Sequence, residues 1–534
     1  MAALLRNQEH EWIRFYATTF NLNWHDIIQV VLRSKDIRLS SLWSLICDIG
    51  QYYETPLLIQ AIFQESEDLL QLYFAKYPQG VNQIFHGFTP FQICVQWPKG
   101  IQMLVSSQIN IPIDEYALWL AVCSDRLESV KRFLEAGCMM EYGCRTRNIF
   151  HAASKRCLAL IASNLVARRR ALLLLAQQQL GILQYISNSA DSPDDQASYI
   201  CACLDKSGIQ VPPDLRVPPT WSTIYHFDGT LLHHYRTLYE HGLSQLSSRN
   251  AVGLTFVMKE RFLHPASTWR CNKSQIVDIM AWFDSKGIFD EMATDTLGLG
   301  LNIHATGWHY IASFIGDNST LMSSYTHLPD SFLATVLTKP ARDQCVCWCT
   351  DGERGCLPLY SFLKSRAIQM NHGNGNDPFS HFPHSLQDSE ARRLDTLSNL
   401  IRFLTFEALE MTHTCCEFTM VDDPSSTFGS TRAITNPNTE RSTKIRSNAE
   451  EQKNLCLLEK LMQEFAQIMT GMDLKSSSLQ EFICGYWRSR ISKLFAVDPE
   501  FISTIHDSQA RMELYVLPER LHCLLGKDFE LQRP

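Results

Sequence analysis

The feature that most constrains the fold is a helix-start pattern that recurs over the first 340 residues. It is clearest in Gly87-Phe88-Thr89-Pro90-Phe91-Gln92-Ile93-Cys94. Gly permits a tight turn, Thr caps a helix, and Pro fits the first helical turn, where a missing N–H costs nothing. Weaker copies begin at Ala117, Ile149, Gly253 and Ala305. A unit that recurs in this way cannot bury its apolar face alone, so the pattern predicts a stack of short helix pairs.

A second pattern marks the partner helix of each pair. The clearest copy is Leu127–Cys138, in which Gly137 suits the left-handed residue that ends a helix. Others lie in Gly100–Ser106, Leu238–Gly242 and Ile276–Gly287. Together the two patterns resemble the ankyrin repeat, with its opener G-x-T-P-L-H-x-A and second helix E-x-V-K-x-L-L-x-x-G-A. The predicted fold is all-α, with degenerate ankyrin-type helical repeats and a C-terminal helical, Cys-rich region.

Changes in composition and pattern predict seven segments along the 534 residues. Prolines and polar residues suggest linkers, and a long polar stretch without apolar periodicity predicts disorder. The segments are an N-terminal helical segment (1–80), degenerate repeats (81–185), a linker (186–235), further repeats (236–338), a Cys-rich subdomain (339–420), a disordered linker (421–449) and C-terminal helices (450–534).

Charge and hydropathy exclude several classes of protein. The net charge is −8, so the chain lacks the basic footprint of a nucleic-acid binder. The most apolar run, Cys157–Val166 with Ala171–Ala176, is interrupted by Arg168–Arg170 and is far from the roughly 20 residues that cross a bilayer. We therefore expect no membrane contact and a cytoplasmic or nuclear location, where cysteines are reduced thiols. The three arginines could contact phosphate or an acidic partner, but a solvated helix face is the commoner arrangement.

A dense cysteine block is the main chemical feature. Four cysteines occur as C-x-C-x-C-x6-C, and three more potential ligands follow near the end of a predicted helix, Ala391–Thr412. In an extended segment alternate residues face one way, so the first three thiolates are expected to lie together. Zinc takes four nitrogen or sulfur ligands in a tetrahedron. The candidate ligands are Cys345, Cys347, Cys349, Cys356, His413, Cys415 and Cys416. A structural zinc site and a set of thiols that bind nothing are the two interpretations of the block.

Two segments rich in cysteine, and one further short segment, extend the resemblance beyond generic ankyrin repeats. Asp343–Cys349 with Gly355–Leu359, and Arg402–Leu409 with Thr412–Cys416, together with Trp221–His226, resemble a group of ankyrin-containing proteins of filamentous fungi. The resemblance covers roughly residues 80 to 420. It implies a fold and a lineage but carries no known activity.

Three functions are compatible with these patterns. A protein-interaction scaffold is expected first, because partner binding is the usual use of helical repeat stacks. The second is a substrate adaptor for a ubiquitin ligase, with the helices before residue 80 docking on the ligase core. The third is a metal-dependent protein that uses the Cys/His cluster. Serine nucleophile elbows, Walker A loops and kinase patterns are absent from the sequence, so no enzyme activity and no catalytic residues are predicted. Leu297–Gly300 is interpreted as a plain turn and not as a phosphate loop.

Overall fold

The computed structural model divides into two compact units, Met1–Gln245 and Leu246–Pro534, and is predominantly helical. The described residues are 23–48, 55–77, 84–107, 115–140, 149–181, 194–219, 222–226, 232–259, 273–298, 300–317, 330–343, 345–350, 355–370, 390–414, 417–422, 430–435, 445, 448–471 and 482–495.

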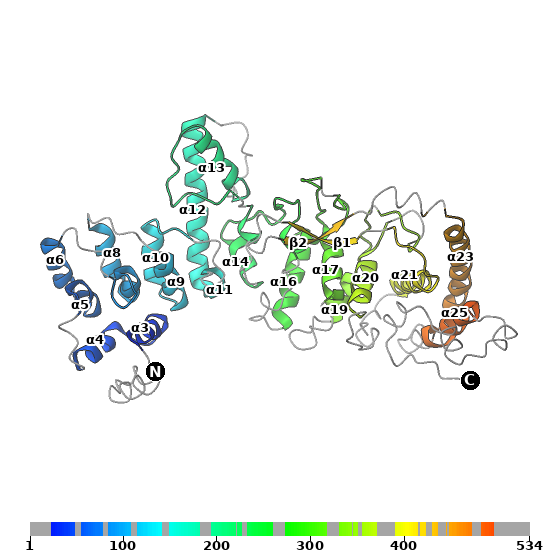
Figure 1. The fold of residues 1–534 in the computed structure, drawn as a ribbon, viewed down its shortest axis with the longest axis horizontal. Helices are drawn as coiled ribbons and strands as arrows, with labels where there is room; N and C mark the ends of the chain where they lie inside the picture. The colour runs from blue at the N-terminus through cyan, green and yellow to red at the C-terminus, as the bar shows by residue number, and fades with distance from the viewer. Residues whose placement is uncertain are drawn as a thin grey trace, which may run out of the picture. The chain divides into compact units, whose positions relative to one another are not determined.

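The first unit is a series of short helices in which each packs against its neighbours (Figure 1). Its elements are α3 (Trp24–Arg33), α4 (Leu39–Asp48), α5 (Leu57–Phe63), α6 (Glu67–Lys76), α7 (Pro90–Ile93), η2 (Cys94–Gln96), α8 (Pro98–Ser106), α9 (Glu115–Cys123), α10 (Leu127–Glu135), α11 (Ile149–Ala152), α12 (Lys155–Leu180), η4 (Asp194–Gln196), α13 (Ala197–Lys206), η5 (Ile224–His226) and α14 (His234–Glu240).

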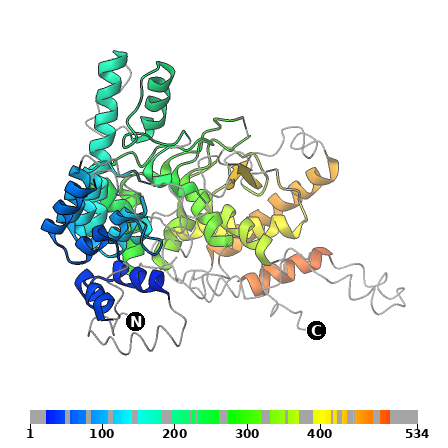
Figure 2. The same ribbon diagram turned by 60° about the vertical axis from the view of Figure 1, so that its left-hand side comes forward.

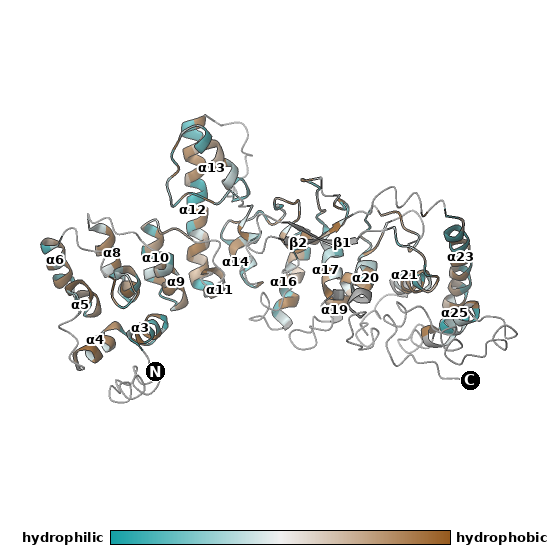
Figure 3. Cartoon of the chain, in the orientation of Figure 1, coloured by the Kyte–Doolittle hydropathy of each residue, from teal (hydrophilic) through white to brown (hydrophobic). Residues whose placement is uncertain are grey.

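The clearest of the expected helix starts and ends are present where the sequence placed them. Thr89 caps α7 with Pro90 in the first turn, and Gly137 ends α10 with a φ of +78°. A further pair, α5 and α6, follows Thr55-Pro56, so helix pairs begin earlier than residue 81. α9 is buried along six consecutive residues, Ala117–Val122, and is hydrophobic over most of its surface (Figure 3), as expected of a helix enclosed by others.

The N-terminal helix α3 is tied to the loop between α9 and α10. Lys35 forms an ion pair with Asp125 at 2.9 Å, and Arg126 donates to the carbonyl oxygen of Lys35 at 2.8 Å. The guanidinium of Arg33 lies 4.9 Å from the ring centre of Trp119 on α9. Residues 23–36 are therefore packed onto α9 and the loop that follows it.

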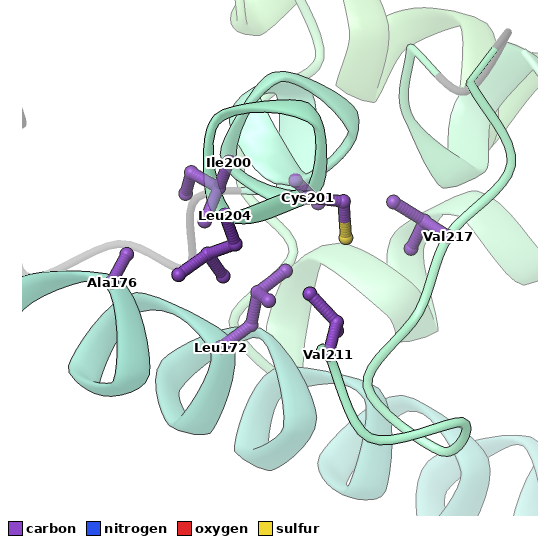
Figure 4. Close-up of a cluster of buried hydrophobic side chains, with 8 residues drawn as sticks. Leu172, Ala176, Ile200, Cys201, Leu204, Val211 and Val217 are labelled. Carbon is purple, nitrogen blue, oxygen red and sulfur yellow. The ribbon is translucent and has the colours of Figure 1, made fainter. Parts of the chain in front are cut away.

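A long helix departs from the repeat pattern. This helix is α12, and α13 packs beside it in both views (Figure 1, Figure 2). The contact has its own small core (Figure 4), which consists of Leu172, Ala176, Ala197, Ile200, Cys201, Leu204, Val211 and Val217. The predicted linker 186–235 thus contributes a helix and core residues.

The expectation that Arg168–Arg170 lie on a solvated face of α12 is wrong for two of the three arginines, which are buried. Arg169 is 1% exposed and pairs with the carboxylate of Asp194 at 2.7 Å, and that carboxylate also accepts the Ile224 N–H at 2.8 Å. Arg168 donates to the carbonyl oxygens of Leu134 and Asp214. Only Arg170 lies on a solvated face. These arginines are buried where acceptors distant in sequence bind their guanidinium groups.

The second unit combines helices with one small sheet. Its elements are η6 (Phe256–Met258), α16 (Lys273–Ser285), η7 (Ile288–Asp290), α17 (Gly307–Asp317), α19 (Asp330–Thr338), α20 (Pro358–Met370), α21 (Glu390–Ala408), β1 (Glu417–Asp422), β2 (Ser430–Thr435), α23 (Ala449–Thr470), the π-helix η9 (Phe482–Trp487) and α25 (Arg488–Phe495). α17 and α20 approach closely at Gly316, where a Cβ would lie 2.3 Å from the carbonyl oxygen of Phe362.

The antiparallel pair β1–β2 differs from the predicted disorder of residues 421–449. The N–H of Asn302 donates to the carbonyl oxygen of Ile434 at 2.8 Å, and the Ile434 N–H donates to the Tyr310 hydroxyl at 3.1 Å. Ala433 and Ile434 are buried. The described strand β2 is therefore held by tertiary hydrogen bonds that its own composition does not signal.

Candidate metal centre

The cysteine block does not form the extended strand that was predicted. Residues 348–350 form a turn, in which the Thr350 N–H donates to the carbonyl oxygen of Cys347 at 3.2 Å. The three alternating sulfurs therefore fall into two groups that could each hold a metal ion: Cys347 with Cys349 and His413, and Cys345 with Asp343 and Cys356. Within each group all ligand atoms lie within 4.8 Å of one another.

The first group joins the turn to the segment after α21. The sulfur of Cys347 lies 3.8 Å from Nδ1 of His413, and Cys347 and Cys349 are both buried. The backbone N–H of Thr414 donates to the Cys347 sulfur at 3.4 Å. This bond holds the segment after α21 against the cysteine turn.

A carboxylate fixes the orientation of the histidine. Nε2 of His413 makes a short hydrogen bond with the buried carboxylate of Glu407 on α21. Because Nε2 carries the hydrogen in this bond, the Nδ1 lone pair faces Cys347. Metal-binding histidines show the same carboxylate–histidine arrangement, in which the second nitrogen is held by an acceptor. Glu407 was not among the predicted site residues, since nothing in the sequence links it to His413 except a separation of six residues.

The second group is organised by Asp343. One carboxylate oxygen accepts the N–H groups of Cys345 at 2.9 Å and Cys356 at 2.6 Å, and the other accepts the side-chain amide of Asn302 at 3.0 Å. Asp343 thus holds the two cysteines side by side through their backbone. Cys345 is disulfide-bonded, to a partner outside the described residues, which differs from the expected reduced thiol.

The two groups meet at a pair of sulfurs. Those of Cys349 and Cys356 are 4.0 Å apart, and both cysteines are buried. The ammonium of Lys364 on α20 lies 3.7 Å from the Cys356 sulfur. A positive charge at this distance favours the thiolate of Cys356.

Arg402, His309 and Gly355 help to fix the main chain around these sulfurs. Arg402 donates twice to the carbonyl oxygen of Trp348, at 3.2 and 3.3 Å, which anchors the turn to α21. His309 contacts the carbonyl oxygen of Cys356 at 3.0 Å. Gly355 has a φ of +71°, and a Cβ there would lie 1.7 Å from the carbonyl oxygen of Asp343. Only glycine fits at this position without a backbone shift.

The remaining candidate ligands and the glycine-containing segment at 297–300 complete the comparison with the sequence predictions. Cys415 and Cys416 lie outside the described residues. At Leu297–Gly300 the Gly300 N–H donates to the carboxylate of Asp295 at 2.8 Å, so a neighbouring side chain occupies this amide. Sequence reasoning missed Asp343, Glu407 and His309, which bind Cys356, His413 and Cys356 over separations of 13, 6 and 47 residues.

No family model matches the chain, and no curated protein or solved structure is significantly similar to it. None of the helices in the described part of the chain is both long enough and apolar enough to cross a membrane.

Proposed function

We propose that the chain is a protein-interaction scaffold built on ankyrin-type helix hairpins. A helix cap that occurs in both units carries the proposal: the N–H of a threonine before the helix donates to the side chain three residues further on. Gln92 accepts the Thr89 N–H at 3.1 Å, and Thr89 accepts the Gln92 N–H at 3.3 Å. In the second unit His309 accepts the Thr306 N–H at 3.1 Å, again three residues further on. The latter pair occupies the Thr and His positions of the T-P-L-H opener.

The loop between paired helices also recurs. Glu65, between α5 and α6, and Asp125, between α9 and α10, have φ values of +49° and +54°. The next N–H donates to the carbonyl oxygen five residues back in both loops, from Ser66 to Ala61 at 3.0 Å and from Arg126 to Ala121 at 2.9 Å. Equivalent loops favour a repeated unit, and repeated units that stack present an extended binding surface.

The scaffold proposal is tested with the full-length chain at its natural abundance in cells. We expect it to elute from a sizing column in a complex, and lysine cross-links from α6, α8 and α10 (Lys76, Lys99 and Lys131) to reach one recurrent partner. Charge reversal at a cross-linked lysine should release that partner, whereas Lys460→Glu on α23 should not. Elution as a single chain without cross-linked partners would overturn the proposal. Ligase subunits cross-linked to residues before 80 would instead support a ubiquitin-ligase adaptor.

We also propose that the second unit binds one structural zinc ion. The arrangement of Cys347, Cys349 and His413, with Glu407 behind the histidine, supports this proposal. Sulfur and imidazole ligands favour zinc over magnesium or calcium, which take oxygen ligands. The test is elemental mass spectrometry of protein purified without a metal-binding tag. We expect about one zinc per chain, lost in Cys347→Ser and Cys349→Ser and retained in the exposed-cysteine control Cys456→Ser. A wild-type chain without metal would contradict the proposal.

A further inference from the structure

We infer that the zinc ligands are Cys347, Cys349, Cys356 and His413, a Cys3His set that joins residues from both groups, with Cys345 and Asp343 outside it. The inference rests on the proposed zinc binding and specifies the site. It differs from either group of three taken alone, because it takes one ligand, Cys356, from the group that Asp343 organises.

The observed separations match the edges of a zinc tetrahedron. With Zn–S bonds of about 2.3 Å and a Zn–N bond of about 2.0 Å, two sulfurs lie about 3.8 Å apart and a sulfur and a nitrogen about 3.6 Å apart. The structure has 4.0 Å between the Cys349 and Cys356 sulfurs and 3.8 Å from the Cys347 sulfur to His413 Nδ1. Two opposite edges of the tetrahedron are thus already formed, and Cys347 and Cys349 join them within 4.8 Å.

Asp343 is excluded because its carboxylate is already used. Three donors occupy it, namely the N–H groups of Cys345 and Cys356 and the Asn302 amide. Coordination of a metal by Asp343 would cost hydrogen bonds of buried N–H groups, and a buried donor left without an acceptor is destabilising. Asp343 is instead a positioning residue that presents Cys356 towards Cys349.

Cys345 is excluded by its disulfide, since a sulfur in a disulfide is no thiolate. Its sulfur also accepts a hydrogen bond from Asn302 at 3.4 Å. Once Cys345 is excluded, Cys356 is the described sulfur, besides that of Cys347, that lies next to Cys349.

Charge supports the same set. Zn²⁺ with three thiolates and a neutral histidine carries a net charge of −1, and buried charge requires compensation. Lys364 stands 3.7 Å from the Cys356 sulfur, and the Thr414 N–H stands 3.4 Å from the Cys347 sulfur. Glu407 accepts the remaining ring hydrogen of His413 and so fixes the tautomer that leaves Nδ1 free to bind metal.

Closure of the site requires one side-chain movement. Cys356 does not belong to the group formed by Cys347, Cys349 and His413, so its sulfur must move closer to these atoms when metal binds. Its backbone is fixed by Asp343 and by His309, so rotation of the Cys356 side chain brings the sulfur inward.

The first test is X-ray absorption at the zinc edge of the wild-type protein, purified with its disulfide intact. We expect three sulfurs at about 2.3 Å and one nitrogen at about 2.0 Å. A shell of four sulfurs, or of two sulfurs and two nitrogen or oxygen atoms, would overturn the ligand set. Zinc that is absent from the wild-type chain would instead be a failure of the proposed zinc binding, which separates the two outcomes. This measurement does not depend on a variant that must fold.

Variants give the second test, with zinc affinity measured by chelator competition. Cys356→Ser should lose zinc as Cys347→Ser does, whereas Cys345→Ser and the exposed control Cys456→Ser should keep wild-type affinity. Zinc retained by Cys356→Ser, or lost by either of the last two variants, would overturn the set. Glu407→Ala should weaken zinc binding about 10–100-fold, and Glu407→Gln, which keeps an acceptor, should restore part of it. Equal affinities for wild type and Glu407→Ala would refute the positioning role.

Discussion

His309 donates its Nε2 hydrogen to the carbonyl oxygen of Cys356 across 3.0 Å, while its Nδ1 accepts the N–H of Thr306 at 3.1 Å. The Thr306 N–H can only donate, so it fixes the neutral tautomer with hydrogen on Nε2. Burial lowers the pKa of His309 to about 4, which agrees with a neutral ring at ordinary pH. One side chain thus caps α17 and holds the backbone of a cysteine 47 residues away.

Replacement of His309 tests this double role. His309→Ala leaves a buried N–H and a buried carbonyl oxygen unpaired and opens a cavity, so we expect a loss of about 2–4 kcal/mol in the free energy of unfolding. Urea unfolding of metal-free protein measures the change, which removes any contribution from zinc. His304→Ala, at a half-buried residue just before α17, should change stability by less than about 0.5 kcal/mol. Equal losses in the two variants would argue against the role of His309.

The buried ion pair in the first unit gives a second prediction. The side chains of Arg169 and Asp194 are 1% and 2% exposed. Removal of either one therefore leaves the other as a buried charge without its ion-pair partner. Arg169→Met should destabilise the unit by about 3–5 kcal/mol, as is typical when one member of a buried pair is removed. Thermal and urea unfolding measure this, with Arg170→Met on the exposed face of the same helix as the control. If both variants unfold alike, the pair has no structural importance.

A structural feature of this chain could be predicted from its sequence where the residues that form it are close together along the chain. Helix caps and left-handed turns are local, so Thr89 and Gly137 behave as their residue types predict. Arg169 was expected on a solvated face because its acceptor, Asp194, lies in a polar segment 25 residues away. The strand β2 was missed for the same reason, since its partners Asn302 and Tyr310 lie more than 120 residues earlier.

The candidate site was predicted by residue type but not by grouping. Five of the seven expected ligands lie in two adjoining groups, because cysteine and histidine identities are visible in the sequence. The turn at residues 348–350 separates Cys345 from Cys347. Arg402 holds this turn through a hydrogen bond to the carbonyl oxygen of Trp348, and the sequence gives no sign of a contact between residues so far apart. Glu407 and Asp343 act through hydrogen bonds whose geometry only the folded chain defines.

Asp125 gives a prediction about pH. Burial would raise the pKa of its carboxyl, but hydrogen bonds from Ser154, Lys35 and Cys157 outweigh burial and hold the pKa below its usual value. A lowered pKa in the folded state stabilises the fold above the unfolded pKa of about 4, and this contribution is lost as pH falls through the folded value.

Asp125→Asn should therefore flatten the acid limb of the stability curve between about pH 5 and pH 3, because it removes the titrating group. Asn tolerates the positive φ of this position, so backbone strain does not confuse the comparison. The measurement is the urea midpoint at a series of pH values. The exposed Glu135→Gln serves as the control and should leave the slope unchanged. An unaltered acid limb in Asp125→Asn would disprove the role of this carboxylate.

The last prediction separates conformational strain from close contact at glycine. Gly355 and Gly298 have similar φ values, +71° and +66°, but a Cβ at Gly355 would lie 1.7 Å from the carbonyl oxygen of Asp343, whereas at Gly298 it would meet nothing within 4 Å. Gly298→Ala should cost about 1 kcal/mol, the usual penalty for a left-handed alanine. Gly355→Ala should cost clearly more and should also weaken zinc binding, because the Asp343 main chain must move and Asp343 positions Cys356. Thermal unfolding and zinc affinity measure the two effects. Similar stability and zinc affinity in the two variants would show that Gly355 is needed for its φ alone, and that the contact with Asp343 does not position the cysteine.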